Sequence, residues 1–89
     1  MPSQIAIVAS KIGLHARPAS LLVKIATSAG VPITIGRVGQ KAVNAASMLS
    51  VLALGAKSGE ELEVTVTDGP NAEQVLTQLV EIVTTDHDG

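Results

Sequence analysis

The stretch Glu61-Leu62-Glu63-Val64-Thr65-Val66-Thr67 carries the most regular pattern in this 89-residue chain. Its aliphatic residues alternate with acidic and hydroxyl residues, which predicts a strand with one face in a core and the other in water. Asp68-Gly69-Pro70 then predicts a turn. A helix is expected over residues 71–83, with one apolar face formed by Ala72, Val75, Leu76, Leu79 and Val83.

The N-terminal third predicts another strand and another helix. Residues 4–9 form a short aliphatic strand with Ile5 and Ile7 on one face and Val8 on the other. Residues 16–29 are expected to be helical, because apolar residues recur there at i, i+3, i+4 and i+7. Pro18 fits the first turn of this helix, where a missing N–H costs no hydrogen bond.

The middle of the chain predicts a hairpin and a short helix. Strands are expected over residues 33–37 and 41–43, joined by a turn at Gly39. Ser47 is the expected N-cap of a helix that contains Met48, Leu49, Val51 and Leu52. The order is βαββαβα, which indicates an α+β fold with an antiparallel sheet and helices on one face. We expect one domain over residues 1–89, with a frayed tail over residues 84–89.

The composition excludes several classes of protein. Apolar residues make up 46% of the chain and aromatic residues 0%, so the core must be aliphatic. Cysteine is absent, which excludes a disulfide framework, a thiolate nucleophile and a cysteine-based zinc site. A net charge of −2, scattered cations and no aromatic side chains argue against nucleic-acid binding. Without a secretory signal or an apolar run of about 20 residues, we expect a cytoplasmic protein without membrane insertion.

One segment concentrates reactive side chains: Gly13-Leu14-His15-Ala16-Arg17-Pro18-Ala19. The predicted helix places His15 just before its first turn, where backbone amides and the helix dipole favour anions. With the Arg17 guanidinium, the amides of Ala16 and Arg17 predict a phosphate site. Nearby positive charge should favour a neutral imidazole, which is a nucleophile. The alternative is a surface histidine beside a helix start, with Arg17 merely solvated.

Two separated blocks of sequence carry a resemblance to a known family. The 13–19 segment and Val43-Asn44-Ala45-Ala46-Ser47-Met48-Leu49, followed by Leu54-Gly55, resemble the HPr family of histidine-containing phosphocarriers of the bacterial phosphoenolpyruvate-dependent sugar phosphotransferase system. The resemblance implies an open-faced β-sandwich, with a four-stranded antiparallel sheet and three helices on one side. It also implies that His15 accepts a phosphoryl group through Nδ1 (pros-phosphohistidine) from phosphorylated Enzyme I and passes it to sugar-specific IIA domains, while Arg17 stabilises the phosphate.

The same resemblance implies a relay rather than an enzyme, because catalysis comes from the partners. The chain has no nucleotide-binding loop and no metal-ligand spacing, so neither a cofactor nor a metal is expected. Asp86-His87-Asp88 is interpreted as a solvated trio in the tail. The scattered Arg37 and the acidic Glu60 are interpreted as surface residues. A monomer is expected.

Partner docking is implied for an apolar patch around the histidine, which by position comprises Ala16, Ser20, Lys24, Met48, Leu49 and Leu52. The alternative for Met48, Leu49 and Leu52 is packing in the core. Ser47 lies where many Gram-positive relatives are phosphorylated. Such regulation would add a kinase/phosphorylase or transcriptional regulators to the partners. The alternative is that Ser47 is a plain N-cap. Ala45-Ala46 replaces a lysine common before this serine, and Ile12 a small polar residue; both departures count against such regulation.

The sequence leaves two other classes of protein open. A regulatory binding module would act by surface recognition alone, and the presence of His15 and Arg17 argues against it. A ferredoxin-like or RNA-binding domain has a similar size and element order. The acidic charge and the lack of aromatic residues argue against that class.

Overall fold

Strands and helices follow one another along the chain in the order predicted from the sequence. The computed structural model describes residues 1–85. Its elements are β1 (Ser3–Ile7), α1 (Ala16–Ala29), β2 (Ile33–Arg37), β3 (Val43–Asn44), α2 (Met48–Ala53), β4 (Glu61–Val66) and α3 (Ala72–Thr84). The βαββαβα order is therefore confirmed.

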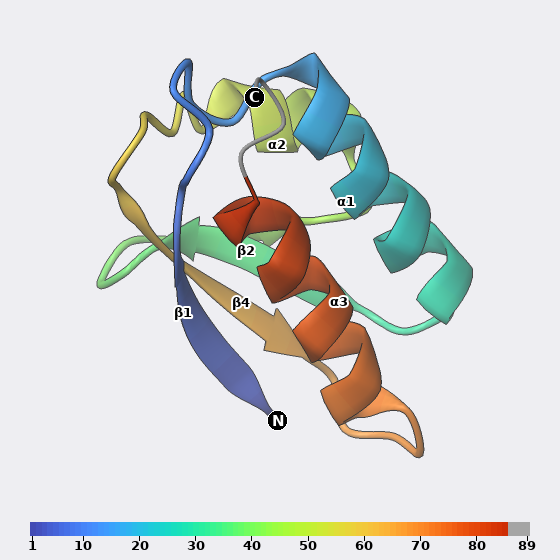
Figure 1. Ribbon diagram of the computed structural model, residues 1–89. Coiled ribbons are helices and arrows are strands. Elements are labelled where there is room, and N and C mark those ends of the chain that lie inside the picture. The colour runs from blue at the N-terminus through green and yellow to red at the C-terminus, as the bar shows by residue number, and fades with distance from the viewer. Residues whose placement is uncertain (86–89) are drawn as a thin grey trace.

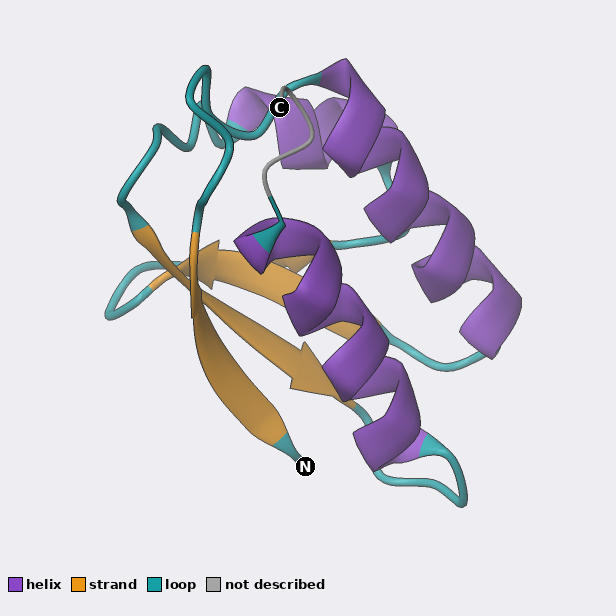
Figure 2. Ribbon diagram, in the orientation of Figure 1, coloured by secondary structure: helices purple, strands orange, loops and turns teal. Residues whose placement is uncertain are grey.

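The strands form one antiparallel sheet in the order β1-β4-β2-β3. The strand β4, whose pattern was the clearest in the sequence, lies between β1 and β2 and pairs Val64 with Gln4 and with Ile35. Figure 1 shows α1 and α3 lying side by side across one face of the sheet, with α2 near the N-terminal end of α1. The opposite face carries no helix, as Figure 2 shows. The expected open-faced sandwich, with a four-stranded sheet and three helices, is confirmed.

The core between sheet and helices is aliphatic. Its fully buried side chains come from both layers and include Leu22, Ile35, Val51, Leu62, Val64 and Leu79. In β1 the buried face is that of Ala6, which continues at Val8, whereas Ile5 and Ile7 lie exposed on the open face of the sheet. The larger side chains of β1 are thus the ones that face solvent.

Several element bounds differ from the sequence-based prediction. The strand β1 ends at Ile7 rather than Ala9, because its partner β4 begins only at Glu61. The residues directly before β4 form a turn in which Glu60 N–H donates to Lys57 C=O. The strand β3 is Val43–Asn44 rather than residues 41–43, because a turn closed by Gln40 N–H and Arg37 C=O delays the return strand. The predicted bounds of α1 and β2 are confirmed.

The C-terminal helix extends further than the pattern indicated. Thr84, which the prediction placed in the frayed tail, is the last residue of α3, and Thr85 is its C-cap. Both threonine hydroxyls donate to carbonyls of the preceding turn, which extends the helix end. Residues 86–89, including His87, lie outside the described residues. Within residues 1–85, no helix has the length and apolar character needed to cross a membrane.

Candidate functional site

His15 is the N-cap of α1, as the sequence predicts. Its backbone is extended, with φ −107° and ψ −172°, and its carbonyl accepts the first helical hydrogen bond from Ala19 N–H at 3.0 Å. The amides of Ala16 and Arg17 have no acceptor within the helix, and Pro18 has no N–H. The N-terminus of α1 therefore presents two backbone donors directly after His15.

The loop before His15 is anchored to a distant part of the chain. Leu14 N–H donates to the carbonyl of Ala56 at 2.9 Å, and the Leu14 side chain is buried. Gly13 has φ +84°, and a Cβ added there would lie 2.4 Å from the same carbonyl oxygen. This close approach requires glycine at position 13. The position of His15 is thus set by backbone contacts on its N-terminal side as well as by α1.

The imidazole of His15 is partly buried. Its Nε2 atom is buried, so the exposed part of the residue belongs to its other atoms. Arg17 is exposed two residues further on and forms no ion pair with any residue in the range 1–85. The site therefore combines a histidine, two helix-terminal amides and a guanidinium that has no carboxylate partner among residues 1–85.

The residues predicted to form a docking patch are brought to one end of the molecule, where α1 contacts α2. On α1, Ala16, Ser20 and Lys24 are exposed. On α2, Leu49 is 81% exposed and Leu52 is also exposed, whereas Met48 is partly buried and packs against the core. The core alternative therefore applies to Met48 and not to Leu49. The structure adds Ile12, which is 70% exposed in the loop before His15 and was treated in the sequence only as a departure.

Ser47 caps α2, which confirms its structural assignment. Its hydroxyl oxygen accepts a hydrogen bond from Ser50 N–H at 3.3 Å, and its carbonyl accepts one from Val51 N–H. The preceding turn is held by the Asn44 side chain, which accepts from Ala46 N–H at 2.9 Å. The helix that carries Leu49 and Leu52 therefore starts at a fixed point.

Sequence reasoning missed an ion pair close to this end of the fold. Arg37 Nε donates to Glu60 Oε2 at 2.5 Å and Nη2 donates to Oε1 at 3.1 Å. Hydrogen bonds from Arg37, and then from the Lys57 amide, lower the pKa of Glu60 from 4.5 to about 2. The hydrogen bonds with Glu60 in turn raise the pKa of Arg37. The interpretation of both residues as surface charges missed that they pair with each other. The available signal was the alternation that puts Arg37 on the face of Ile33 and Ile35, where a charge needs a partner.

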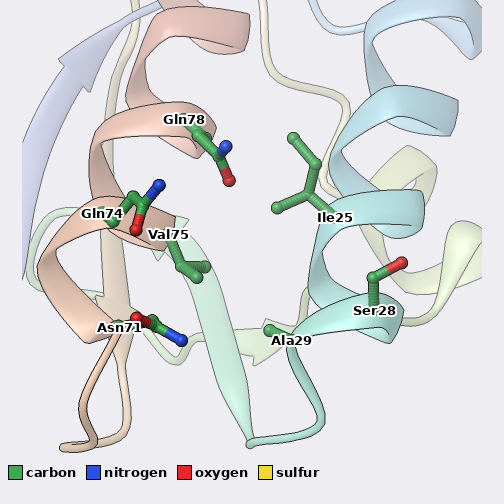
Figure 3. Close-up of a pocket in the computed structure, with 7 residues that line it drawn as sticks. All are labelled: Ile25, Ser28, Ala29, Asn71, Gln74, Val75 and Gln78. Carbon is green, nitrogen blue, oxygen red and sulfur yellow. The ribbon is translucent and has the colours of Figure 1, made fainter.

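A groove elsewhere on the surface lies away from these residues. Figure 3 shows a groove between α1 and α3 with a volume of about 320 Å³, lined by Ile25, Ser28, Ala29, Asn71, Gln74, Val75 and Gln78. It contains none of the site residues predicted from the sequence. The histidine site is instead a surface, which suits contact with another protein rather than enclosure of a small molecule.

Comparison with known proteins places this geometry in a family. The family model described as "PTS HPr component phosphorylation site" matches residues 2–85. The chain belongs to the HPr family. It is therefore a phosphocarrier of the phosphotransferase system, in agreement with the resemblance in the sequence.

Individual HPr proteins are similar over most of the chain. The phosphocarrier protein HPr of Streptomyces coelicolor is 54% identical over 71 residues, which cover 80% of this chain and 75% of that protein. A crystal structure of HPr from Thermoanaerobacter tengcongensis has a TM-score of 0.81 at 30% identity, covering 93% of this chain and 91% of that chain. An HPr dimer from the same organism has a TM-score of 0.66 at 32% identity, covering 80% and 79% of the two chains.

Proposed function

We propose that His15 is the phosphoryl acceptor of this carrier and that Nδ1 is the atom that is phosphorylated. The single observation that supports this choice is the burial of Nε2, since a buried nitrogen cannot meet a phosphoryl donor on another protein. Phosphorylated Enzyme I is the proposed donor, and sugar-specific IIA domains are the proposed acceptors. The family supports a partner among the phosphotransferase components.

The proposed transfer needs little chemistry from the carrier itself. With the imidazole proton on Nε2, the Nδ1 lone pair forms the new N–P bond. The bond between phosphorus and the donor atom breaks, and its electron pair remains on the donor. Onward transfer reverses these roles, because the Nδ1–P bond breaks as the acceptor atom attacks. Catalysis therefore resides in the partner enzymes, and we propose a carrier rather than an enzyme.

The residues after His15 would hold the transferred group. The amides of Ala16 and Arg17 point along the axis of α1 toward its N-terminus, where the helix dipole favours the phosphate dianion. The exposed Arg17 guanidinium adds charge-assisted hydrogen bonds. These groups favour phosphoryl transfer by positioning and charge stabilisation, which is the main requirement of this reaction class.

Incubation with Enzyme I and phosphoenolpyruvate tests the assignment. We expect a mass increase of about 80 Da, for one phosphoryl group, in an adduct that is labile to acid and stable to base. His15→Ala should abolish the adduct. The chain has one other histidine, so His87→Ala is the matched control and should leave the adduct unchanged. Loss of the adduct in His87→Ala and its persistence in His15→Ala would overturn the proposal.

Docking is proposed for the exposed residues around His15, with Leu49 as the main apolar contact. A cytoplasmic location and a monomeric state remain predictions; light scattering tests the latter against a dimer like that of the T. tengcongensis relative. Regulation through Ser47 also remains a prediction. No observation favours it, because the Ser47 hydroxyl already serves the cap of α2.

A further inference from the structure

A segment without helix or strand, residues 54–60, supports the loop over residues 8–15, which carries His15. We call these residues the support segment. It contacts the beginning of the loop through Val8 N–H and Glu60 C=O at 3.0 Å and through Gly59 N–H and Val8 C=O at 2.8 Å. It contacts the end of the loop through Leu14 N–H and Ala56 C=O at 2.9 Å. Both ends of the loop are therefore bonded to the same segment.

The support segment is itself held by one side chain. Arg37, the last residue of β2, donates from Nη1 to the carbonyl of Leu54 at 2.7 Å and from Nη2 to the carbonyl of Gly55 at 3.2 Å. Its other contacts are the two hydrogen bonds to the Glu60 carboxylate. Arg37 thus bonds both ends of the support segment, on either side of the Ala56 carbonyl that receives Leu14.

Glu60 completes the arrangement from within the segment. Its Oε1 atom accepts from Lys57 N–H at 2.8 Å as well as from Arg37, which closes the 57–60 turn. The Arg37 and Glu60 side chains are 28% and 30% exposed, so neither is a freely solvated surface charge. A bidentate, partly shielded pair of this kind holds a defined geometry better than an exposed ion pair does.

The same guanidinium also connects the loop to the docking helix. Leu54 is the C-cap of α2, and a cation at its carbonyl offsets the negative end of that short helix. Arg37 therefore contacts the end of the helix that carries Leu49 and the segment that supports Leu14. One side chain links the two parts of the surface that a partner protein must meet together.

We propose that Arg37 is a positioning residue for phosphoryl transfer, acting through the support segment to fix His15 relative to α2. Arg37 does not contact the phosphate. It holds the Ala56 carbonyl at the place where Leu14 is bonded, one residue before the acceptor. The inference rests on the proposed role of His15. Because the forked guanidinium makes bonds to three groups at once, lysine can replace only part of its role.

The test compares variants of the full chain in transfer from phosphorylated Enzyme I. Arg37→Met removes all four hydrogen bonds and keeps the unbranched apolar stem of the side chain, whereas Arg37→Lys keeps only the charge. We expect Arg37→Met to lower kcat about tenfold, since small misplacements of reacting groups cost that much or more. Arg37→Lys should recover only part of the rate. Glu60→Gln, which keeps an acceptor oxygen, should lie between Arg37→Lys and the unmodified chain.

A matched control separates positioning from general stability. Val75 packs against the core near the C-terminal end of α1. Because α1 has 14 residues, that end lies about 21 Å from His15 at its N-terminus. Val75→Ala should lower the melting temperature without lowering kcat. Equal transfer rates for Arg37→Met and Val75→Ala at equal loss of thermal stability would overturn the proposal. If Arg37→Met does not fold, the same comparison is made with Glu60→Gln.

A second readout needs no partner protein. Amide hydrogen exchange at Leu14 and Val8 reports the bonds to the support segment directly. We expect exchange at both amides to accelerate in Arg37→Met, relative to Val75→Ala of matched stability. Unchanged protection would overturn the proposal. If His15→Ala retains the phosphoryl adduct, the assignment of His15 as the acceptor fails. Accelerated exchange at Leu14 in Arg37→Met would still show that Arg37 holds the support segment. Failure of the proposed function and failure of this inference are therefore distinguishable.

Discussion

The amide of Leu14 donates to the carbonyl of Ala56 at 2.9 Å, and this hydrogen bond lies one residue before His15. Helix α1 fixes the residues after the histidine, and Ala56 fixes the residue before it. His15, the proposed acceptor, is therefore held from both sides, by α1 and by Ala56, which lie far apart in the sequence. Its ring thus lies on a surface with a well-defined backbone, which would favour transfer between large protein partners.

Gly13→Ala should disturb this relationship more than an ordinary substitution of a turn glycine. A methyl group at position 13 meets the Ala56 oxygen at 2.4 Å, in addition to the strain of φ +84°. We expect a loss of unfolding free energy of about 2–4 kcal/mol and slower phosphorylation of His15. Urea unfolding and the transfer assay measure these two effects.

Gly39→Ala is the matched control for that substitution. Gly39 has φ +79°, but no atom lies within 4 Å of an added Cβ. Gly39→Ala should therefore lower the unfolding free energy only by the cost of backbone strain, about 1 kcal/mol. The rate of phosphoryl transfer should be unchanged. If both variants lose the same free energy and keep the same transfer rate, the contact between Gly13 and Ala56 has no role in placing the site.

Arg17→Ala should slow phosphoryl transfer without affecting folding. Arg17 is exposed and lacks an ion-pair partner within residues 1–85, so its truncation breaks no ion pair in that part of the chain. Its removal takes away a charge-assisted contact to the phosphate, and we expect a decrease of about 10-fold or more in kcat. Lys41→Ala, which removes an exposed cation from the β2–β3 hairpin, should leave kcat unchanged. Identical rates for the two variants would remove Arg17 from the site.

The local parts of the fold could be predicted from the sequence because their causes are local. The alternation in residues 61–67 and the apolar face of residues 16–29 each reflect one strand or one helix against one core. His15 and Ser47 were found for the same reason, since N-caps depend on neighbouring residues. The hydrophobic pattern of β1 did not reveal which of its faces is buried, because both faces carry apolar residues.

The contacts that fix the site could not be predicted in the same way. The pairing of Arg37 with Glu60 joins the end of β2 to a turn before β4, and no periodicity links the two positions. The contact between Gly13 and Ala56 likewise depends on how the loop and the support segment cross. Such pairs follow from tertiary packing, and a single sequence carries only indirect signs of them, such as a charged residue on a buried face.

Leu49→Ala should weaken docking without lowering stability. Leu49 is 81% exposed, so truncation leaves no cavity. We expect KM for Enzyme I to rise severalfold, because an apolar contact that is buried only in the complex is lost. Val51→Ala in the same helix is the opposite case: Val51 is fully buried, and its truncation should cost about 2 kcal/mol of unfolding free energy. A lower stability of Leu49→Ala with unchanged KM would contradict a docking role.

Glu60 should make the stability of the protein depend on pH in the acid range. The pKa of Glu60 is lowered from 4.5 to about 2 in the folded state, chiefly by its hydrogen bonds with Arg37. The folded protein therefore holds the ionised form more strongly than the unfolded chain does. The stabilisation from this group is fully present above pH 4.5, declines as the pH falls, and is lost below about pH 2.

Urea unfolding of the unmodified chain and of Glu60→Gln at a series of pH values measures this contribution. The difference in unfolding free energy between the two proteins should be largest above pH 4.5 and should shrink as the pH falls toward 2. The same Glu60→Gln change made on an Arg37→Met background should show a much smaller dependence on pH, because Arg37 is the main cause of the lowered pKa. A difference that stays constant from pH 7 to pH 2, or one equally large without Arg37, would contradict the ion pair as the source of the effect.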